Sequence, residues 1–272
     1  MNCSLSKLRR CHPLLGTFVE ITAAGDTAAA VQAAIDEAFA AIGRVQALMS
    51  FHDPASELSR VNRAAASGKT VRVSPQIYHV LAFAKALHAG TQGIFDIAAA
   101  RTQDQGAGTA DIELLPDHAV RCLRPLTIDL GGVAKGFAVD CAIEVLRGAD
   151  MDSALVNAGG DMRCFGRPQP VCIRHPGMPG RFVPLPDLND AALATSANSY
   201  TACAHFHGRT RGPVRRPFSV SVRATTCMMA DALTKVVLAC GQRSAPLLSE
   251  FDADAFMVYP DGRVICWEKE EA

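Results

Sequence analysis

The residues best suited to chemistry lie in the window 126–145, which reads LTIDLGGVAKGFAVDCAIEV. Asp129 ends a β-rich run, two glycines follow, and Lys135 lies at the start of an amphipathic helix. Glycines between a strand and a helix let backbone N–H groups approach a ligand, and a helix N-terminus favours an anion. We therefore interpret Asp129, Gly131, Gly132 and Lys135 as a cradle for a phosphate or diphosphate, with an ordinary strand-to-helix turn as the alternative.

A second charged pair lies near the end of the chain, in the segment ATTCMMADALTKVVLACG. The segment is apolar on nearly every helical face, which predicts a buried helix that ends at Gly241. Asp231 and Lys235 are its only charged residues, and a buried carboxylate needs a charged partner or a metal ion. Their spacing of four puts both on one face, so they form either a structural ion pair or a site in which Asp231 is a metal ligand or base.

Two other stretches could contact a ligand. The polar turn MSFHDPASELSRVN carries Phe51 and His52, which could present a ring to a ligand base. The segment 205–216, HFHGRTRGPVRR, is basic and could hold phosphate. A solvated loop is the alternative reading of both stretches.

Composition limits the classes of function. The chain has 272 residues, of which 49% are hydrophobic and 20% charged, as in a soluble globular protein of one or two domains. Lys plus Arg equals Asp plus Glu, 27 each, so no overall field attracts nucleic acid or an anionic membrane. The sequence has no apolar run of the roughly 18 residues that a transmembrane segment needs, and its first residues do not form a signal peptide.

The cysteines indicate a compartment. The chain has ten, without a C-x-x-C pair or the spacing of a zinc site. We expect most of them to be buried as small hydrophobic residues, which fits a reducing environment. With no signal peptide, the prediction is a cytoplasmic location.

Hydrophobic periodicity predicts the helices that position these residues. Apolar residues at spacings of three and four predict a long core helix at 27–49, capped by Asp26. Pro75 begins a helix that runs to about residue 88. The helix after the glycine turn has an apolar stripe, and Asp140 lies off that stripe, where it is as consistent with a surface charge as with a site residue.

Strands alternate irregularly with these helices. Strands are predicted at 17–22 and 122–130, a glycine-turned hairpin at 153–165, and an irregular polar stretch at 101–117. This order has no strict βαβ rhythm, so an α+β fold is favoured over a doubly wound sheet. The sequence shows no clear linker, which predicts a single domain over 1–272.

Seven stretches, in order along nearly the whole chain, resemble the ApbE family, the FAD:protein FMN transferases. They are LLGTFVEIT, MSFHDPASELSRVN, GIFDIA, IDLGGVAKGFAVD, ALVNAGGDMRCFG, LATSANSY and CMMADALTKVVLACG. The resemblance implies a T-fold-like α+β arrangement of two similar, intertwined subdomains with the flavin site between them. It also implies a Mg²⁺-dependent reaction that splits FAD at its diphosphate.

In that reaction FMN moves to a Thr or Ser hydroxyl of an acceptor flavoprotein, typically a subunit of a redox complex, and AMP leaves. Two alternatives stay open at this point. The same pocket could act as an FAD pyrophosphatase that gives FMN and AMP, or it could bind FAD without catalysis.

The resemblance also assigns residues to roles. It places Asp231 and His205 in catalysis, and it places the oxygens of Gly132, Asp231 and Thr234 around the metal ion, a donor set that suits Mg²⁺. The positions that match FAD contacts are Leu15, His52, Ile94, Phe95, Asp96, Asp129, Lys135 and Phe206.

The chain departs from the family pattern at three places. The family motif D-A-L-S-T reads D-A-L-T-K here, so Lys235 stands in place of a metal-site threonine and Thr234 comes one residue early. Ala197 replaces a glycine in T-S-G-x-Y. The H-I-x-D-P-x-T-G segment survives only as HFHGRTRG, in which His205 and Phe206 keep their places.

Overall fold

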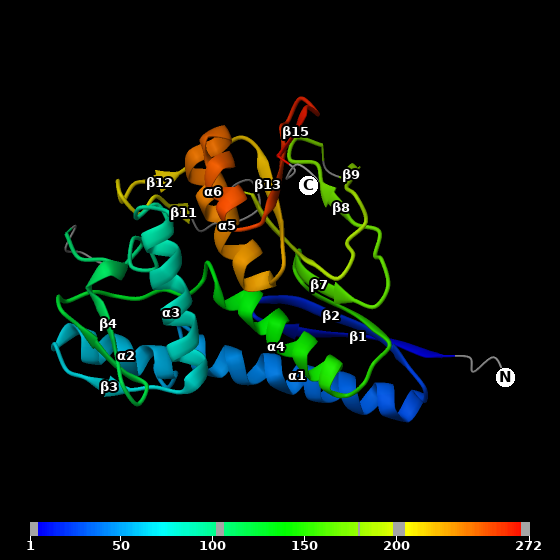
Figure 1. Cartoon of the computed structure of the whole chain (residues 1–272), viewed down its shortest axis with the longest axis horizontal. Coiled ribbons are helices and arrows are strands. Elements are labelled where there is room, and N and C mark those ends of the chain that lie inside the picture. The colour runs from blue at the N-terminus through cyan, green and yellow to red at the C-terminus, as the bar shows by residue number, and fades with distance from the viewer. Residues whose placement is uncertain (1–4, 102–105, 179, 198–204, 268–272) are drawn as a thin grey trace.

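Eight strands form one antiparallel sheet, in the spatial order β1-β2-β6-β7-β10-β13-β14-β15, in the computed structural model of the chain (Figure 1). The structure describes residues 5–101, 106–178, 180–197 and 205–267. The strands are β1 (Ser6–Leu14), β2 (Thr17–Gly25), β6 (Ser153–Ala158), β7 (Asp161–Phe165), β10 (Ala192–Ala197), β13 (Ser219–Ala224), β14 (Asp254–Val258) and β15 (Val264–Trp267).

Three helices pack against this sheet, and each covers a different pair of strands. Helix α1 (Ala28–Met49) contacts β1 and β2, α4 (Ala134–Gly148) contacts β6 and β7, and α5 (Cys227–Cys240) contacts β10 and β13. Neighbouring helices also contact each other, α1 with α4 and α4 with α5 (Figure 1). The predicted α+β class is therefore confirmed: helices form one layer on an antiparallel sheet.

A smaller unit extends from this layer and supplies one wall of the site. It contains α2 (Glu57–Ala66), α3 (Pro75–Gly90), the turn η1 (Thr109–Asp111) and a sheet of β3 (Val71–Arg72), β5 (Ala119–Cys122) and β4 (Ile112–Leu115) (Figure 1). The other short elements are β8 (Cys172–Arg174), β9 (Phe182–Pro184), β11 (His205–Phe206), β12 (Pro213–Val214), η2 (Gly241–Ser244) and α6 (Ala245–Glu250).

The large sheet opens at its centre. Strands β7 and β10 pair over only two residue pairs, whereas β10 pairs with β13 over six. Beyond that short pairing the Asp161 carboxylate accepts a hydrogen bond from the backbone N–H of Thr195, at 3.3 Å, in place of a strand partner. The gap leaves polar groups of both strands facing a common space.

Several predicted boundaries need correction. Thr27, not Asp26, caps α1, because its hydroxyl accepts the N–H of Ala30. The strand predicted at 122–130 is wrong: β5 ends at Cys122, and residues 123–130 are not in a strand. The stretch 101–117, predicted to be irregular, contains η1 and β4. The edge strand β1 was not predicted, because it is exposed along most of its length and lacks an alternating apolar pattern.

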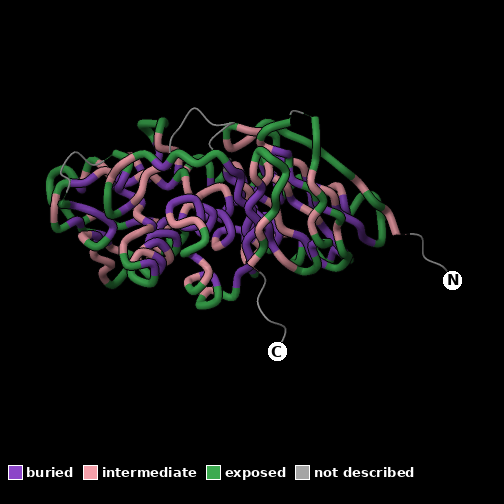
Figure 2. The backbone as a smooth tube through the Cα atoms, turned by 90° about the horizontal axis from the view of Figure 1, so that it is seen from above, coloured by how far each residue is buried: buried purple, intermediate pink, exposed green. Residues whose placement is uncertain are grey.

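One continuous cluster of buried apolar side chains joins the layer and the smaller unit. It includes Ile35 and Ile42 of α1, Leu81 of α3, Ile143 of α4 and Leu233 of α5, each fully buried. Buried segments run through the interior along the length of the molecule, with exposed residues around them (Figure 2). The single domain of two similar subdomains stays a prediction.

The cysteines are less buried than predicted. In the described part of the chain Cys122, Cys164 and Cys227 are buried, Cys141 and Cys240 are half-buried, and Cys11, Cys172 and Cys266 are exposed. The expectation that most cysteines belong to the core is therefore wrong for these residues. Among the described residues, no helix has the length and apolar character that a membrane crossing requires.

Candidate functional site

A cavity of about 1080 Å³ lies at the open centre of the large sheet. It is at the upper end of the roughly 300–1,000 Å³ typical of ligand pockets, so it suits a large ligand. Ten of the twelve residues predicted for the site border it: Leu15, His52, Ile94, Phe95, Asp96, Asp129, Gly132, Lys135, His205 and Phe206. The other two, Asp231 and Thr234, are fully buried behind it.

Two ion pairs underlie the cavity and make up its floor: their lysines border the cavity, and their carboxylates lie buried behind them. Lys135 of α4 pairs with Asp161 at the start of β7, and Lys235 of α5 pairs with Asp231 one turn earlier on the same helix. Both carboxylates are buried, Asp161 with 1% and Asp231 with 0% of its side chain exposed, while both lysines reach the cavity. The structural ion pair considered for Asp231 and Lys235 is therefore present.

The N-terminus of α4 also holds Asp231. The backbone N–H of Gly136 donates to Asp231 Oδ2 at 3.2 Å, and α4 has no side-chain cap of its own. A free helix N-terminus attracts an anion, and here that anion belongs to α5. The N-terminus of α4 is thus already paired with a protein carboxylate, and the phosphate cradle at the glycine turn before it stays a prediction.

Neighbouring charges set the protonation of this cluster. Burial opposes ionisation of Asp231, but Lys135 and then Lys235 outweigh it and lower the pKa of that carboxyl. Burial also favours the neutral amine of Lys135, yet Asp231 and Asp161 together raise its pKa above the ordinary value. For Asp161, burial and the nearby charge of Asp231 dominate and raise the pKa. Of the two carboxyl groups, Asp231 is therefore the one held more strongly in its ionised form.

Lys235 makes more contacts than this ion pair. Its Nζ lies 3.0 Å from the main-chain oxygen of Asp231, 3.1 Å from Thr234 Oγ1 and 3.2 Å from Ser196 Oγ. The Ser196 and Thr234 hydroxyls are themselves hydrogen bonded at 2.8 Å. A Cβ on Gly132 would lie 3.5 Å from Lys235 Cε, so the lysine stem lies against the glycine turn.

His205, on β11, borders the same cavity. Burial, followed by the positive charge of Lys235, lowers the pKa of His205 to about 4. The imidazole is therefore neutral near pH 7 and can accept a proton. Phe206, the next residue, adds an apolar surface to the same wall.

The 94–96 segment is anchored mainly through the side chain of Asp96. Its carboxylate accepts the Thr109 hydroxyl at 2.8 Å and the Ala98 N–H at 2.7 Å, and lies 3.3 Å from Arg211. Only 3% of this side chain is exposed. Asp96 therefore fixes the wall of the cavity more than it offers a free charge to a ligand.

The glycine turn is held from two sides. Asp129 accepts the Gly131 N–H at 2.9 Å and pairs with Arg101 at 3.1 Å. The amide of Asn62 on α2 both donates to and accepts from the backbone of Ile128, at 2.9 and 2.8 Å. Asn62 is the last residue of the polar turn predicted to contact a ligand, and its side chain instead fixes the segment before the glycines.

The opposite rim is formed by the turn between β1 and β2. Leu15 and Gly16 both have positive φ, 55° and 70°, as a tight two-residue hairpin turn requires. The Leu15 N–H donates to Gln46 of α1 at 2.5 Å. His52 is exposed at this rim and meets Phe51 edge to face.

Sequence reasoning missed three polar side chains. Asp161 was read only as part of a hairpin turn. Asp140 is buried: it pairs with Arg163 at 2.9 Å and accepts the first N–H groups of α5, from Cys227 and Met228, at 2.9 and 2.8 Å. Asp140 lies off the apolar stripe of its helix, and its local sequence gives no signal of partners 87 and 88 positions away.

The third missed residue is Ser219, at the start of β13. Its hydroxyl is buried at the edge of the cavity and has no hydrogen-bond partner in the described part of the chain. A buried polar group without a partner is costly, so this hydroxyl is placed to bind a ligand.

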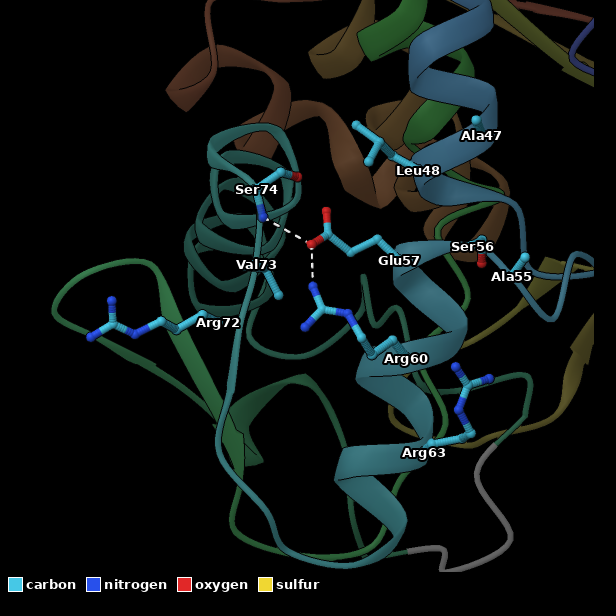
Figure 3. A pocket seen from close by; sticks show the side chains of 10 residues that line it. All are labelled: Ala47, Leu48, Ala55, Ser56, Glu57, Arg60, Arg63, Arg72, Val73 and Ser74. Atoms are coloured by element: carbon cyan, nitrogen blue, oxygen red, sulfur yellow. Dashed lines mark hydrogen bonds and ion pairs between the residues drawn. The ribbon is translucent and has the colours of Figure 1, made fainter.

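A second cavity, of about 540 Å³, lies beside α2 and is lined by Arg60, Arg63 and Arg72 (Figure 3). Glu57 at its centre accepts from the Ser74 N–H at 3.1 Å and from Arg60 at 2.5 Å. The three guanidinium groups point in different directions and do not converge on one point (Figure 3). The residues predicted for the site lie at the larger cavity or behind it.

Comparison with known proteins gives concordant matches. The sequence model described as the ApbE family matches residues 15–257. An FAD:protein FMN transferase of Rhodobacter capsulatus is 28% identical over 71% of this chain and 44% of its own length. The chain thus spans less than half of that relative.

Solved structures show the same fold. The flavin transferase ApbE from Vibrio cholerae superposes with a TM-score of 0.81 at 21% identity, covering 98% of both chains. The apo form of a Pseudomonas stutzeri flavinyl transferase ApbE gives a TM-score of 0.83 at 19% identity, over 98% of this chain and 95% of the other.

Proposed function

The chain belongs to the ApbE family, and we propose from this that it is an FAD:protein FMN transferase. FAD is the donor, a Thr or Ser hydroxyl of an acceptor flavoprotein receives FMN as a phosphoester, and AMP is released. The relative named above carries this function in its name. An acceptor that forms part of a redox complex is the partner expected from the family resemblance.

The observation that carries the proposal is the meeting of base and cations in one cavity. A neutral imidazole, His205, shares the cavity with the ammonium groups of Lys135 and Lys235. Transfer of a phosphoryl group needs an activated hydroxyl and positive charge beside the diphosphate, with little other covalent chemistry from the protein. His205 would meet the first requirement and the two lysines the second, and all three line the same cavity.

The proton balance assigns His205 its role. The acceptor hydroxyl oxygen forms a bond to the FMN phosphorus, and the bond from that phosphorus to the bridging oxygen breaks. AMP leaves with the bridging oxygen and its electron pair, and the hydroxyl proton passes to Nδ1 or Nε2 of His205. Asp231, predicted as a catalytic base, is fully buried and ion-paired, so it supports the charge of Lys235 from behind the cavity wall.

The residues present fit FAD as the substrate. The orphaned Ser219 hydroxyl needs a partner that a ligand can supply. Across the cavity, Gly131 and Gly132 let the backbone come close to a phosphate, and Lys135 supplies charge beside them. Ile94, Phe95 and Phe206 offer apolar surface for a flavin ring.

The residues do not fit Mg²⁺ in the arrangement that the family resemblance implied. The oxygens of Asp231 and Thr234 would suit a hard cation, but the ammonium of Lys235 already contacts them. The lysine stem also lies against Gly132, the third expected ligand. We therefore assign no step of the reaction to a metal ion.

The proposal is tested with the purified protein, FAD, magnesium and an acceptor flavoprotein domain. Intact mass spectrometry should show the acceptor gaining one FMN on a Thr or Ser, with an equal amount of AMP on chromatography. AMP and free FMN without any gain on the acceptor would indicate a pyrophosphatase instead. Tight FAD binding with no AMP released, across several acceptors, would contradict catalysis altogether.

A further inference from the structure

The ammonium of Lys235 lies in a cage of oxygen atoms. Its contacts are the carboxylate and main-chain oxygens of Asp231 and the hydroxyls of Thr234 and Ser196. An ammonium has three hydrogens to donate, so four oxygens are one more than ordinary hydrogen bonding uses. Carboxylate, carbonyl and hydroxyl oxygens are also the donors that hard metal cations prefer.

The cage is built into the fold. Thr234 donates its hydroxyl to the main-chain oxygen of Asp231 at 2.7 Å and meets Ser196 of β10 at 2.8 Å, so helix and strand fix its oxygens together. Asp231 and Thr234 are fully buried, and Ser196 is 8% exposed. The Lys235 side chain is 13% exposed and borders the cavity, so its charge faces the substrate on one side and the cage on the other.

We propose that the ammonium of Lys235 is a tethered cation that takes the place of a divalent metal ion in this cage. The protein then acts on FAD without a divalent cation bound there. The catalytic half of this inference rests on the proposed function, whereas the occupancy of the cage does not.

The charges around the cage support this assignment. The floor of the cavity holds two carboxylates, Asp161 and Asp231, and two ammonium groups, Lys135 and Lys235, so it is already neutral. A divalent ion bound to Asp231 would add two positive charges beside an ammonium, unless Lys235 left the cage. Its stem is held between Asp231 and the turn at Gly132, where the resemblance placed the metal.

The role of the ammonium in the reaction is electrostatic. Negative charge builds on the bridging oxygen as its bond to the FMN phosphorus breaks, and a fixed positive group at the cavity floor stabilises that charge. Lys235 supplies one unit of charge in a position that needs no ion from solution. Lys135 supplies a second one from α4.

The first test measures metal binding directly, with Mn²⁺ as the probe and electron paramagnetic resonance as the readout. The wild-type chain should bind Mn²⁺ at least about tenfold more weakly than a Lys235→Thr variant, which frees the cage and should take one equivalent. Adding Asp231→Asn to that variant should abolish the binding. Lys69→Thr makes the same chemical change at an exposed lysine and should behave as wild type.

The inference is overturned if the wild-type chain binds Mn²⁺ as tightly as Lys235→Thr. It is also overturned if neither protein binds the ion, because the oxygens would then not form a cation site. Thermal unfolding and circular dichroism establish that each variant is folded, and a Lys235→Ser variant serves as a second form with a free cage.

The second test follows AMP release from FAD in excess EDTA and in magnesium. The wild-type rate should agree within about twofold between the two conditions, while Lys235→Thr should lose about tenfold or more in EDTA and recover in magnesium. A wild-type rate that collapses in EDTA and returns with magnesium contradicts the inference. If no protein releases AMP under any condition, the proposed function fails, and the Mn²⁺ measurement still decides whether Lys235 occupies the cage.

Discussion

At the scale of single residues, the site depends on a few buried charges that compensate each other. Asp231 contacts Lys235 and the first turn of α4, and the nearby ammonium groups lower its pKa. Removing one member of a buried pair leaves the other charge in a poorly solvated place, which costs far more than losing an exposed pair. The roles of Asp231 in stability and in function are therefore linked.

An Asp231→Ala variant should lose AMP release and also about 3–5 kcal/mol of unfolding free energy, because Lys235 is left buried without its carboxylate. Urea denaturation and nucleotide chromatography measure the two effects. Glu37→Ala, which breaks the exposed pair with Arg44, is the control and should cost at most about 1 kcal/mol. Unchanged turnover in Asp231→Ala would refute the assignment of this site.

The proposed base gives a prediction on pH. Since burial and Lys235 lower the pKa of His205 to about 4, its neutral form is present above that pH and is lost as the pH falls through it. The rate of AMP release with acceptor should therefore keep its value from pH 7 down to about 5 and fall near 4. His205→Gln should lower the rate and remove its fall near pH 4. A fall in rate at the ordinary histidine pKa, about 6.5, would contradict His205 as a buried base.

At the scale of elements, α4 and α5 begin by capping one another. Asp140 of α4 accepts the first N–H groups of α5, and Asp231 of α5 accepts the N–H of Gly136 on α4. The helices approach so closely that a Cβ on Gly136 would lie 2.3 Å from the main-chain oxygen of Cys227. This contact holds α4 against α5, the two helices that carry Lys135 and Lys235.

Gly136→Ala should therefore destabilise the protein by about 1–3 kcal/mol, although alanine is the better helix former, because backbone atoms cannot move aside cheaply. Chemical denaturation measures the loss, and FAD binding should weaken with it. Gly43→Ala in α1 is the matched control: a Cβ there meets nothing within 4 Å, so stability should rise by up to about 1 kcal/mol. Equal effects in the two variants would contradict the close helix contact.

Periodicity was sufficient to predict the long helices and one hairpin. The helices α1, α3 and α5 and the hairpin β6–β7 were predicted within a few residues, because each has a clear apolar stripe or a glycine turn. Long-range polar partners have no such pattern. Asp140 was as consistent with a surface charge as with a site residue, and the pairing of Asn62 with Ile128 joins positions 66 apart. Such contacts depend on tertiary packing, which local sequence does not encode.

At the scale of the whole molecule, the cavity lies where two parts of the sheet barely pair. Strands β6 and β7 and the helix α4 stand on one side, and β10, β13 and α5 on the other. Within the sheet the two sides meet through β7 and β10, over two residue pairs, and through side chains such as Asp161, while α4 and α5 pack against each other on the helical layer. A ligand that contacts both sides therefore adds contacts that the sheet itself lacks.

FAD should raise the thermal stability of the whole chain. A ligand at about one hundred times its dissociation constant contributes roughly 2.7 kcal/mol, which for a protein of this size raises Tm by about 5 °C. Differential scanning fluorimetry with FAD, FMN and AMP separates the contributions of the FMN and AMP parts of FAD to the rise in Tm. Lys135→Met should reduce the FAD shift, and the absence of any shift at millimolar FAD would contradict binding in this cavity.

The mutual capping of α4 and α5 has a consequence for folding. The carboxylate at the N-terminus of α5 comes from a residue 87 positions away, and the one at the N-terminus of α4 from a residue 95 positions away. Neither helix N-terminus is therefore fully paired until α4 and α5 have docked. The two segments should then gain protection from amide hydrogen exchange together, and lose it together, as one cooperative unit. During synthesis, a nascent chain of only the first 200 residues contains α4 but not Asp231, so the N-terminus of α4 has no carboxylate partner until α5 has been made.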